Sequence, residues 1–223
     1  MNINVVAGYS FPDFEARKKG TGVVVPDFYP IVGGVEAAEA VLEAGARIVQ
    51  FRHKQFFSRE VFEDARRIAN LCRSAGALFV VNDRADIAML LGAGLHLGQD
   101  DLPPAEARRL MPAGSIIGFS THNESQLRAA DREPVDYLAI GPIFATGSKQ
   151  NPDPVVGVEE LRRLRALTNK PLIAIGGITR ENALAVFEAG ADSIAVIGDL
   201  SGEPRARAEE WMTICSSHRS RRP

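Results

Sequence analysis

Residues 180–197 read RENALAVFEAGADSIAVI, a helical segment that leads through a glycine into a short apolar strand. Gly190 between the two suits a left-handed helix C-cap, which turns the chain back towards a sheet. The same transition recurs at Glu43-Ala44-Gly45-Ala46 and at Leu91-Gly92-Ala93-Gly94. This weak internal repeat predicts a fold built from successive strand–helix units.

The rest of the chain alternates in the same way, with short β-branched apolar runs separated by helical stretches, which is typical of βα units around a parallel sheet. The expected strands lie near Phe28–Val32, Ile48–Phe51, Leu78–Val81, Gly94–Leu97, Ile116–Ser120, Tyr137–Ile140, Leu172–Ile175 and Ser193–Ile197. The expected helices lie near Val35–Ala44, Arg59–Ala75, Ala85–Leu91, Pro104–Met111, Ser125–Asp131, Val158–Leu167, Arg180–Ala189 and Arg205–Cys215. Eight such units predict the α/β class and a single (β/α)8 TIM barrel with an N-terminal extension. A doubly wound open sheet is disfavoured because no GxGxxG follows the first strand.

This pattern divides the chain into three parts. Residues 1–25 are expected to form an N-terminal arm or short helix, residues 26–215 the barrel, and residues 216–223 a basic flexible tail. Frayed polar ends are common in globular domains. A tail that contacts phosphate or RNA is the alternative for residues 216–223.

Composition narrows the class of protein further. The 223 residues are 45% hydrophobic and 24% charged, with a net charge of −2, which is ordinary globular composition and gives no positive field for nucleic acid. No apolar run is long enough to span a bilayer, and no signal peptide is recognised. Two cysteines, Cys72 and Cys215, are too few for a disulfide framework, so a cytoplasmic protein with reduced thiols is expected.

Cationic side chains follow the second expected strand, at the barrel end where chemistry is found in this fold. Arg52 and Lys54 alternate along the chain, so both side chains can point to one side. The planar fork of arginine and the point charge of lysine together suit a polyphosphate. A solvated pair of loop charges is the alternative interpretation.

Two carboxylates follow the third and fourth expected strands. Asp83 and Asp101 would therefore lie side by side near the cationic site. Mg²⁺ prefers oxygen ligands and commonly bridges to substrate phosphates. Helix capping is the alternative for both residues, since each precedes an expected helix.

Glycines follow the seventh and eighth strands, where this fold often binds phosphate. Gly176-Gly177 precedes a helix expected to begin near Thr179, whose free amides would attract an anion. Ile197-Gly198 would lie beside it. A plain tight turn is the alternative. His96 is expected to be a hydrogen-bonded barrel histidine, and Trp211 an anchor for the last helix.

In this order, the segments at the strand ends resemble those of the thiamine-phosphate synthase family, over Phe28 to Leu200. The motifs are Gln50-x-Arg52-x-Lys54, Asn82-Asp83-Arg84, His96-x-Gly98-Gln99-x-Asp101, Ser120-Thr121-His122, Gly141-Pro142-x-Phe144 leading to Thr146-x-Ser148-Lys149, and Gly176-Gly177-Ile178. The resemblance implies a transferase that joins a pyrimidine methyl diphosphate to a thiazole phosphate and releases pyrophosphate. It implies a dissociative reaction assisted by Mg²⁺, with small-molecule substrates.

The resemblance also implies roles for particular residues. The pyrimidine diphosphate would bind Gln50, Arg52, Lys54, Asn82, Ser120 and Lys149. Of these, Arg52, Lys54, Ser120 and Lys149 would be catalytic. The thiazole phosphate would bind Thr146, Gly147, Ser148, Gly177, Ile197 and Gly198. Asp83 and Asp101 would hold Mg²⁺.

Three residues depart from the family pattern. His53 stands where an acidic residue is usual, Gly198 where a serine is usual, and Ser148 where a threonine is usual. The changes at His53 and Gly198 leave open a non-catalytic barrel that binds thiamine precursors. An isomerase resembling the thiazole tautomerase paralogue is the other alternative, although such a paralogue would be expected to lack part of the diphosphate and metal set that this sequence has. The oligomeric state also stays open.

Overall fold

The computed structural model describes residues 24–147 and 153–220. Most of the expected N-terminal arm, the last three residues of the expected tail, and Ser148 and Lys149 of the expected site lie outside this part of the chain. Within it, no helix combines the length and apolar character needed to cross a membrane.

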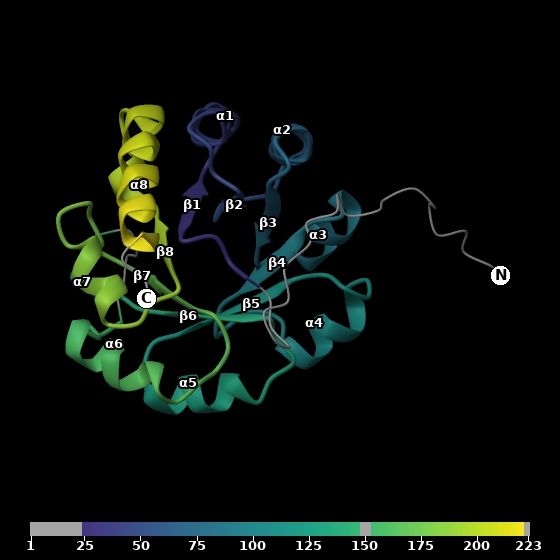
Figure 1. Ribbon diagram of the computed structural model, residues 1–223. Coiled ribbons are helices and arrows are strands. Elements are labelled where there is room, and N and C mark those ends of the chain that lie inside the picture. The colour runs from purple at the N-terminus through teal and green to yellow at the C-terminus, as the bar shows by residue number, and fades with distance from the viewer. Residues whose placement is uncertain (1–23, 148–152, 221–223) are drawn as a thin grey trace.

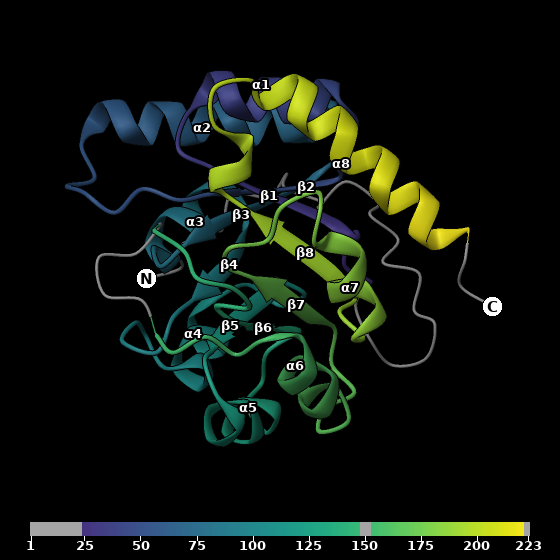
Figure 2. The ribbon, with the colours of Figure 1, turned by 90° about the vertical axis from the view of Figure 1, so that its left-hand side faces the viewer.

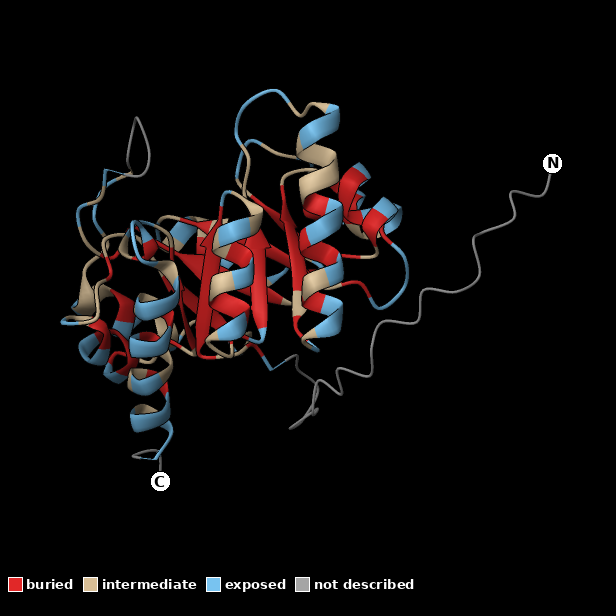
Figure 3. Cartoon of the chain, turned by 90° about the horizontal axis from the view of Figure 1, so that it is seen from above, coloured by how far each residue is buried: buried red, intermediate tan, exposed pale blue. Residues whose placement is uncertain are grey.

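Eight parallel strands close into a barrel in sequence order, as predicted (Figure 1). The strands are β1 (Phe28–Val32), β2 (Ile48–Phe51), β3 (Leu78–Asn82), β4 (Gly94–Leu97), β5 (Ile117–Thr121), β6 (Tyr137–Ile140), β7 (Leu172–Ile175) and β8 (Ser193–Val196). Closure is made by β1 and β8, where Phe28 pairs with Ile194. The strands are almost wholly buried because side chains fill the barrel on one face and helices cover the other (Figure 3).

Helices follow the strands and surround the barrel (Figure 2). They are α1 (Val35–Glu43), α2 (Arg59–Ser74), α3 (Ala85–Leu91), α4 (Pro104–Leu110), α5 (Glu124–Asp131), α6 (Val158–Arg165), α7 (Ala183–Glu188) and α8 (Pro204–Arg219), with a 3-10 turn η1 (Gly198–Leu200) before α8. The glycines of the repeat have φ angles of 101° at Gly45, 61° at Gly92 and 100° at Gly190, so the left-handed turn from helix to strand is confirmed.

The start of α7 was predicted wrongly. The helix begins at Ala183, not near Thr179 or Arg180. The side chain of Asn182 accepts a hydrogen bond from the Thr179 amide at 2.9 Å and donates to the Gly177 carbonyl at 3.2 Å. These side-chain bonds hold residues 179–182 as a turn in place of the first helical turn.

The basic tail expected from residue 216 is partly wrong as well, because α8 continues to Arg219. Arg219 donates to the Asp27 carboxylate at 2.5 Å, and the His218 ring stacks on Phe187 with centroids 4.4 Å apart. Trp211 anchors the same helix as predicted, since it is fully buried and stacks on Phe28. These contacts fix residues 216–219 against the barrel.

Inside the barrel, Gly118 on β5 leaves the space that the ring of Tyr137 occupies. A β-carbon at this position would overlap the tyrosine ring. We expect Gly118→Ala to lower the free energy of unfolding by about 1–3 kcal/mol, since overpacking a buried site forces side chains to shift. Chemical denaturation would measure the change in the free energy of unfolding. Gly33→Ala is the control, because a β-carbon there meets nothing within 4 Å; equal stability of the two variants would contradict the prediction.

Candidate active site

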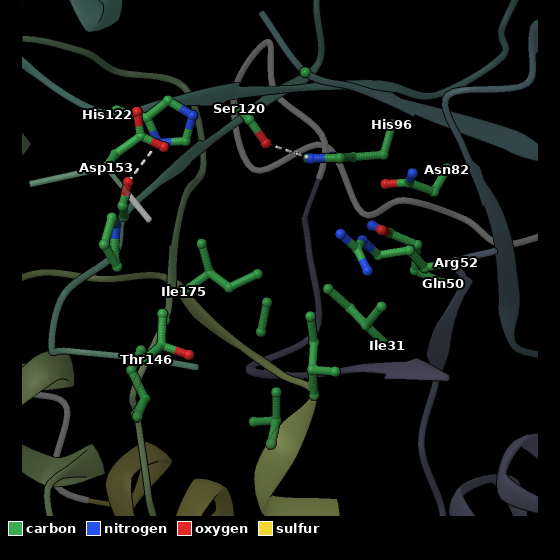
Figure 4. Close-up of a pocket in the computed structure, with 18 of the residues that line it drawn as sticks. Ile31, Gln50, Arg52, Asn82, His96, Ser120, His122, Thr146, Asp153 and Ile175 are labelled. Atoms are coloured by element: carbon green, nitrogen blue, oxygen red, sulfur yellow. Dashed lines mark hydrogen bonds and ion pairs between the residues drawn. The ribbon is translucent and has the colours of Figure 1, made fainter. Parts of the chain in front are cut away.

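A cavity of about 1130 Å³ opens at the carboxyl ends of the strands. The predicted site residues that line it are Gln50, Arg52, Lys54, Asn82, Asp83, Asp101, Ser120, Thr146, Gly177, Ile197 and Gly198. Gly147 is described but is not part of this lining. Figure 4 shows Gln50, Arg52, Asn82 and His96 on one side of the cavity, and Thr146 and Ile175 on the other. The strand ends therefore bring together residues that are far apart in the sequence.

The two cations of the β2 end have different surroundings. Nζ of Lys54 lies 2.5 Å from a carboxylate oxygen of Asp83. Arg52 lines the same cavity, and no carboxylate in the described part of the chain forms an ion pair with it. Its charge is therefore directed at the cavity without compensation by the protein, which suits an anionic ligand.

Asp83 holds a backbone conformation that is uncommon for a residue with a β-carbon. Its φ angle is 64°, in the left-handed region, which costs on the order of 1 kcal/mol for a residue with a β-carbon. Burial raises the pKa of Asp83, and the neighbouring Asp101 raises it further, whereas Lys54 opposes the shift. Strained backbone and adjacent carboxylates are features that cluster at functional sites.

Helix capping is not the role of either aspartate. The residue that precedes α3 is Arg84, and the residue that precedes α4 is Pro103; neither helix has a side-chain cap. Asp101 instead accepts a hydrogen bond from the Gly98 amide at 2.7 Å, which fixes the loop after β4.

The aspartate pair fits a divalent cation that takes its other ligands from substrate. Both carboxylates line the cavity, and a cation between them would relieve the repulsion from Asp101 that adds to the effect of burial in raising the Asp83 pKa. Among the described residues, no cluster of three or more metal-ligating side chains is found. Mg²⁺ commonly binds through one or two carboxylates together with substrate phosphates and water, so two protein ligands are sufficient.

Asn82 offers an unused donor beside the aspartates. The residue is buried, and its Nδ2 makes no hydrogen bond within the part of the chain that the structure describes. A buried donor without a partner costs about 1–3 kcal/mol. Because Asn82 lines the cavity, this donor is placed to meet an acceptor on a ligand.

His96 is the hydrogen-bonded barrel histidine that was predicted. Its Nδ1 lies 2.9 Å from the Tyr137 hydroxyl. Its Nε2 lies 2.9 Å from Oγ of Ser120, a contact that is drawn as a dashed line in Figure 4. Burial lowers the pKa of His96 to about 4, and the nearby Asp101 only partly opposes this effect. The ring is therefore neutral at neutral pH.

The glycines after β7 permit a close approach between two loops. Gly176 and Gly177 have φ angles of 96° and 63°. A β-carbon on Gly177 would lie 2.5 Å from the carbonyl oxygen of Ala145, in the loop that carries Thr146. The predicted role of a helix N-terminus at this point is wrong, because α7 begins only at Ala183. The two glycines instead allow the loop after β7 to pack closely against the loop after β6.

Several lining residues were not among the predicted site residues. They include Ile31, Gln99, His122, Gln126, Asp153 and Asp199. Asp199 follows Gly198 directly and accepts from Nε1 of Trp211 at 2.9 Å and from Nε of Arg180 at 3.0 Å, which ties α8 to the cavity rim. Its place just beyond a strand end was the available signal. His53, one of the three residues that differ from the family pattern, does not line the cavity. Its ring lies against Phe51 and Phe57.

A closed barrel with cations, paired carboxylates and buried amides in one cavity at its carboxyl end is typical of (β/α)8-barrel enzymes that act on anionic ligands. A family profile described as thiamine monophosphate synthase matches residues 28–200. The chain belongs to the thiamine-phosphate synthase family, and it is therefore a transferase.

Individual relatives agree with the profile. A thiamine-phosphate synthase from Koribacter versatilis is 51% identical over 181 residues, which covers 81% of this chain and 85% of the relative. A second thiamine-phosphate synthase, from Laribacter hongkongensis, is 43% identical over a region that covers 82% of this chain and 87% of the relative. The solved thiamine phosphate pyrophosphorylase from Pyrococcus furiosus superposes with a TM-score of 0.79 at 34% identity, covering 86% of this chain and 96% of that one.

Proposed function

We propose that the chain joins 4-amino-2-methyl-5-(diphosphooxymethyl)pyrimidine to a thiazole ethyl phosphate and gives thiamine phosphate and pyrophosphate. The observation that carries the proposal is one cavity that is lined by Arg52, by the aspartate pair and by the glycines of the loops after β7 and β8. A volume of about 1130 Å³ is large enough for both substrates together. The names of the relatives support the same reaction.

The diphosphate would bind at the β2–β4 side of the cavity. Arg52 and Lys54 would contact its oxygens, with Gln50, Asn82 and Ser120 along the rest of the pyrimidine substrate. Asp83 and Asp101 would hold Mg²⁺, which supplies positive charge to the leaving pyrophosphate. Lys149 belongs to the same proposed set.

In the proposed reaction, the bond between the pyrimidine methylene carbon and the diphosphate oxygen breaks first. The electron pair leaves with pyrophosphate, and the thiazole nitrogen then bonds to the methylene carbon. Arg52 and Lys54 stabilise the charge that grows on the leaving group. The step requires no proton transfer by the protein, which agrees with the neutral, hydrogen-bonded state of His96.

The thiazole phosphate would bind at the β6–β8 side. Thr146, Gly177, Ile197 and Gly198 line this side of the cavity, and Gly147 and Ser148 belong to the same proposed set. Holding both substrates in line converts a bimolecular step into an intramolecular one, which is the main contribution that such a site makes.

We expect Gly198→Ser to lower the KM for the thiazole phosphate by up to about tenfold, because a hydroxyl would add one hydrogen bond to the phosphate. Gly198 has no positive φ, so serine is compatible with the backbone. Initial rates at varied thiazole phosphate would measure the change. A raised or unchanged KM would contradict this account of the glycine.

The proposed function is tested by incubating the full chain with both substrates and Mg²⁺ and separating the products by chromatography. Formation of thiamine phosphate only when both substrates are present is the expected result. Binding of thiazole phosphate without any thiamine phosphate would instead identify an isomerase or a binding protein.

A further inference from the structure

A continuous series of hydrogen bonds crosses the barrel interior from one cavity residue to another. Nε2 of Gln50 donates to the Tyr29 hydroxyl at 3.0 Å, and the hydroxyls of Tyr29 and Tyr137 lie 2.7 Å apart. The Tyr137 hydroxyl lies 2.9 Å from Nδ1 of His96, and Nε2 of His96 lies 2.9 Å from Oγ of Ser120. Five side chains from five strands are connected in this way.

The members of the series differ in their access to ligand. Gln50, His96 and Ser120 line the cavity, whereas the two tyrosines do not. Tyr29 is 1% exposed and Tyr137 is 0% exposed. The tyrosines can therefore influence a ligand only through the residues to which they are bonded.

With the Gln50 amide oriented so that Nε2, and not Oε1, faces Tyr29, this donor sets the direction of every hydrogen in the series. The Tyr29 oxygen accepts from Gln50, so its own hydrogen is directed to Tyr137, its other bonded partner. Tyr137 then donates to Nδ1 of His96, and the hydrogen of the neutral ring is on Nε2, from which it is donated to Ser120.

The reverse direction leaves one buried hydrogen without an acceptor. If Ser120 donated to His96 and His96 to Tyr137, the Tyr29 oxygen would accept from both Tyr137 and Gln50. Its hydroxyl hydrogen would then have no acceptor in the described part of the chain, and leaving a buried donor unpaired is costly. The forward direction satisfies each group. It also leaves the hydroxyl hydrogen of Ser120 unused.

We propose that Tyr29 and Tyr137 are positioning residues that hold neutral His96 in its Nε2–H tautomer, so that Ser120 is left to donate its hydroxyl hydrogen to an acceptor atom of the ligand. The inference rests on the proposed function for the identity of that acceptor, which would be a ring nitrogen of the aminopyrimidine. The tautomer itself does not depend on the reaction.

The first test is the tautomer of His96 in the ligand-free protein, measured by ¹⁵N NMR at neutral pH. His96→Gln assigns the signals among the four histidines. We expect a protonated Nε2 and an unprotonated Nδ1 in the unaltered chain. Tyr137→Phe removes the donor to Nδ1 but keeps the ring, so a mixture of the two tautomers is expected. A protonated Nδ1 in the unaltered chain would overturn the proposal.

The second test is a double-mutant cycle on the KM for the pyrimidine diphosphate. Ser120→Ala and Tyr137→Phe should each raise it by about tenfold, as the loss of one hydrogen bond predicts. Because Tyr137 acts through Ser120, the double variant should also be about tenfold worse rather than about a hundredfold. Multiplicative effects would show a merely structural tyrosine and would overturn the proposal.

Thr121→Val provides the matched control. This change also removes a buried hydroxyl from β5, one that donates to the Ala139 carbonyl at 2.8 Å, outside the series. The tautomer of His96 should stay the same, and the KM should stay within about twofold. If Tyr137→Phe fails to fold, Tyr29→Phe is used instead, because it interrupts the series one step earlier. The same mixture of His96 tautomers is expected. An unchanged His96 tautomer in this variant would overturn the proposal.

The two proposals can fail separately. A chain that forms no thiamine phosphate but shows Nε2–H in its unaltered form and mixed tautomers in Tyr137→Phe would disprove the proposed function and support the positioning role. A chain that forms thiamine phosphate with a protonated Nδ1 on His96 would support the proposed function and overturn the positioning role.

Discussion

Arg52→Ala should lower kcat/KM for the pyrimidine diphosphate by roughly a thousandfold, a loss typical of removing a preorganised group that stabilises charge in the transition state. Arg52 lines the cavity and has no ion-pair partner among the described residues, so its charge is available to the departing diphosphate. Arg52→Lys should recover only part of the loss, because lysine lacks the planar fork of donors. Steady-state rates with both substrates would measure these effects.

An arginine at the other end of the same strand is a matched control that separates this effect from a general loss of charge. Arg47 precedes β2 at the opposite end of the barrel and donates to the Ala75 carbonyl at 3.3 Å. Arg47→Ala should leave kcat/KM within about twofold. Similar losses for Arg47→Ala and Arg52→Ala would contradict the diphosphate site.

Asp101→Asn should reduce turnover by about a hundredfold or more and shift its dependence on Mg²⁺ to higher concentration, because one of two carboxylate ligands is lost. Asparagine retains an oxygen that can accept from the Gly98 amide, so the loop after β4 should keep its conformation. Asp101→Ala removes that acceptor too and should abolish turnover. Rates measured over a series of Mg²⁺ concentrations would show the change.

An acidic residue outside the cavity serves as the control for the metal assignment. Asp86 pairs with Arg84 at 2.5 Å on the surface of α3 and does not line the cavity. Asp86→Asn should leave both turnover and the Mg²⁺ dependence unchanged. Unchanged activity in Asp101→Asn would remove the basis for a metal at this site.

The barrel was predictable because its periodic signals are local. Continuous apolar runs and the recurring glycine place each strand within about one residue; β1, β2, β4, β6 and β7 match the structure throughout. The convergence of the polar residues followed once the strands were placed, because parallel strands bring their carboxyl ends to one rim of a barrel. Eleven predicted residues thus lie in one cavity.

Features that depend on tertiary contacts were harder to predict from the sequence. The late start of α7 follows from the side chain of Asn182, which bonds to residues of the preceding turn. The full length of α8 follows from the ion pair between Arg219 and Asp27, which are far apart in the sequence. Neither contact has a periodic signature, so propensity alone placed these boundaries wrongly.

The hydrogen-bonded series through the barrel could not be foreseen for a related reason. Tyr29 and Tyr137 each stand within an apolar strand, where a sequence pattern indicates only burial. Their hydroxyls meet because β1 and β6 lie across a closed barrel, and because Gly118 leaves room for one ring. The left-handed backbone of Asp83 is likewise visible only in three dimensions.

The most direct measurement of the central claim is the amount of pyrophosphate released per thiamine phosphate formed, with Mg²⁺ present and then after EDTA. One pyrophosphate for each thiamine phosphate, with both products lost in EDTA and restored by Mg²⁺, is the predicted result. Pyrophosphate release without thiamine phosphate, or full turnover in EDTA, would contradict a cavity in which the aspartate pair and the two phosphate sites act on the two substrates together.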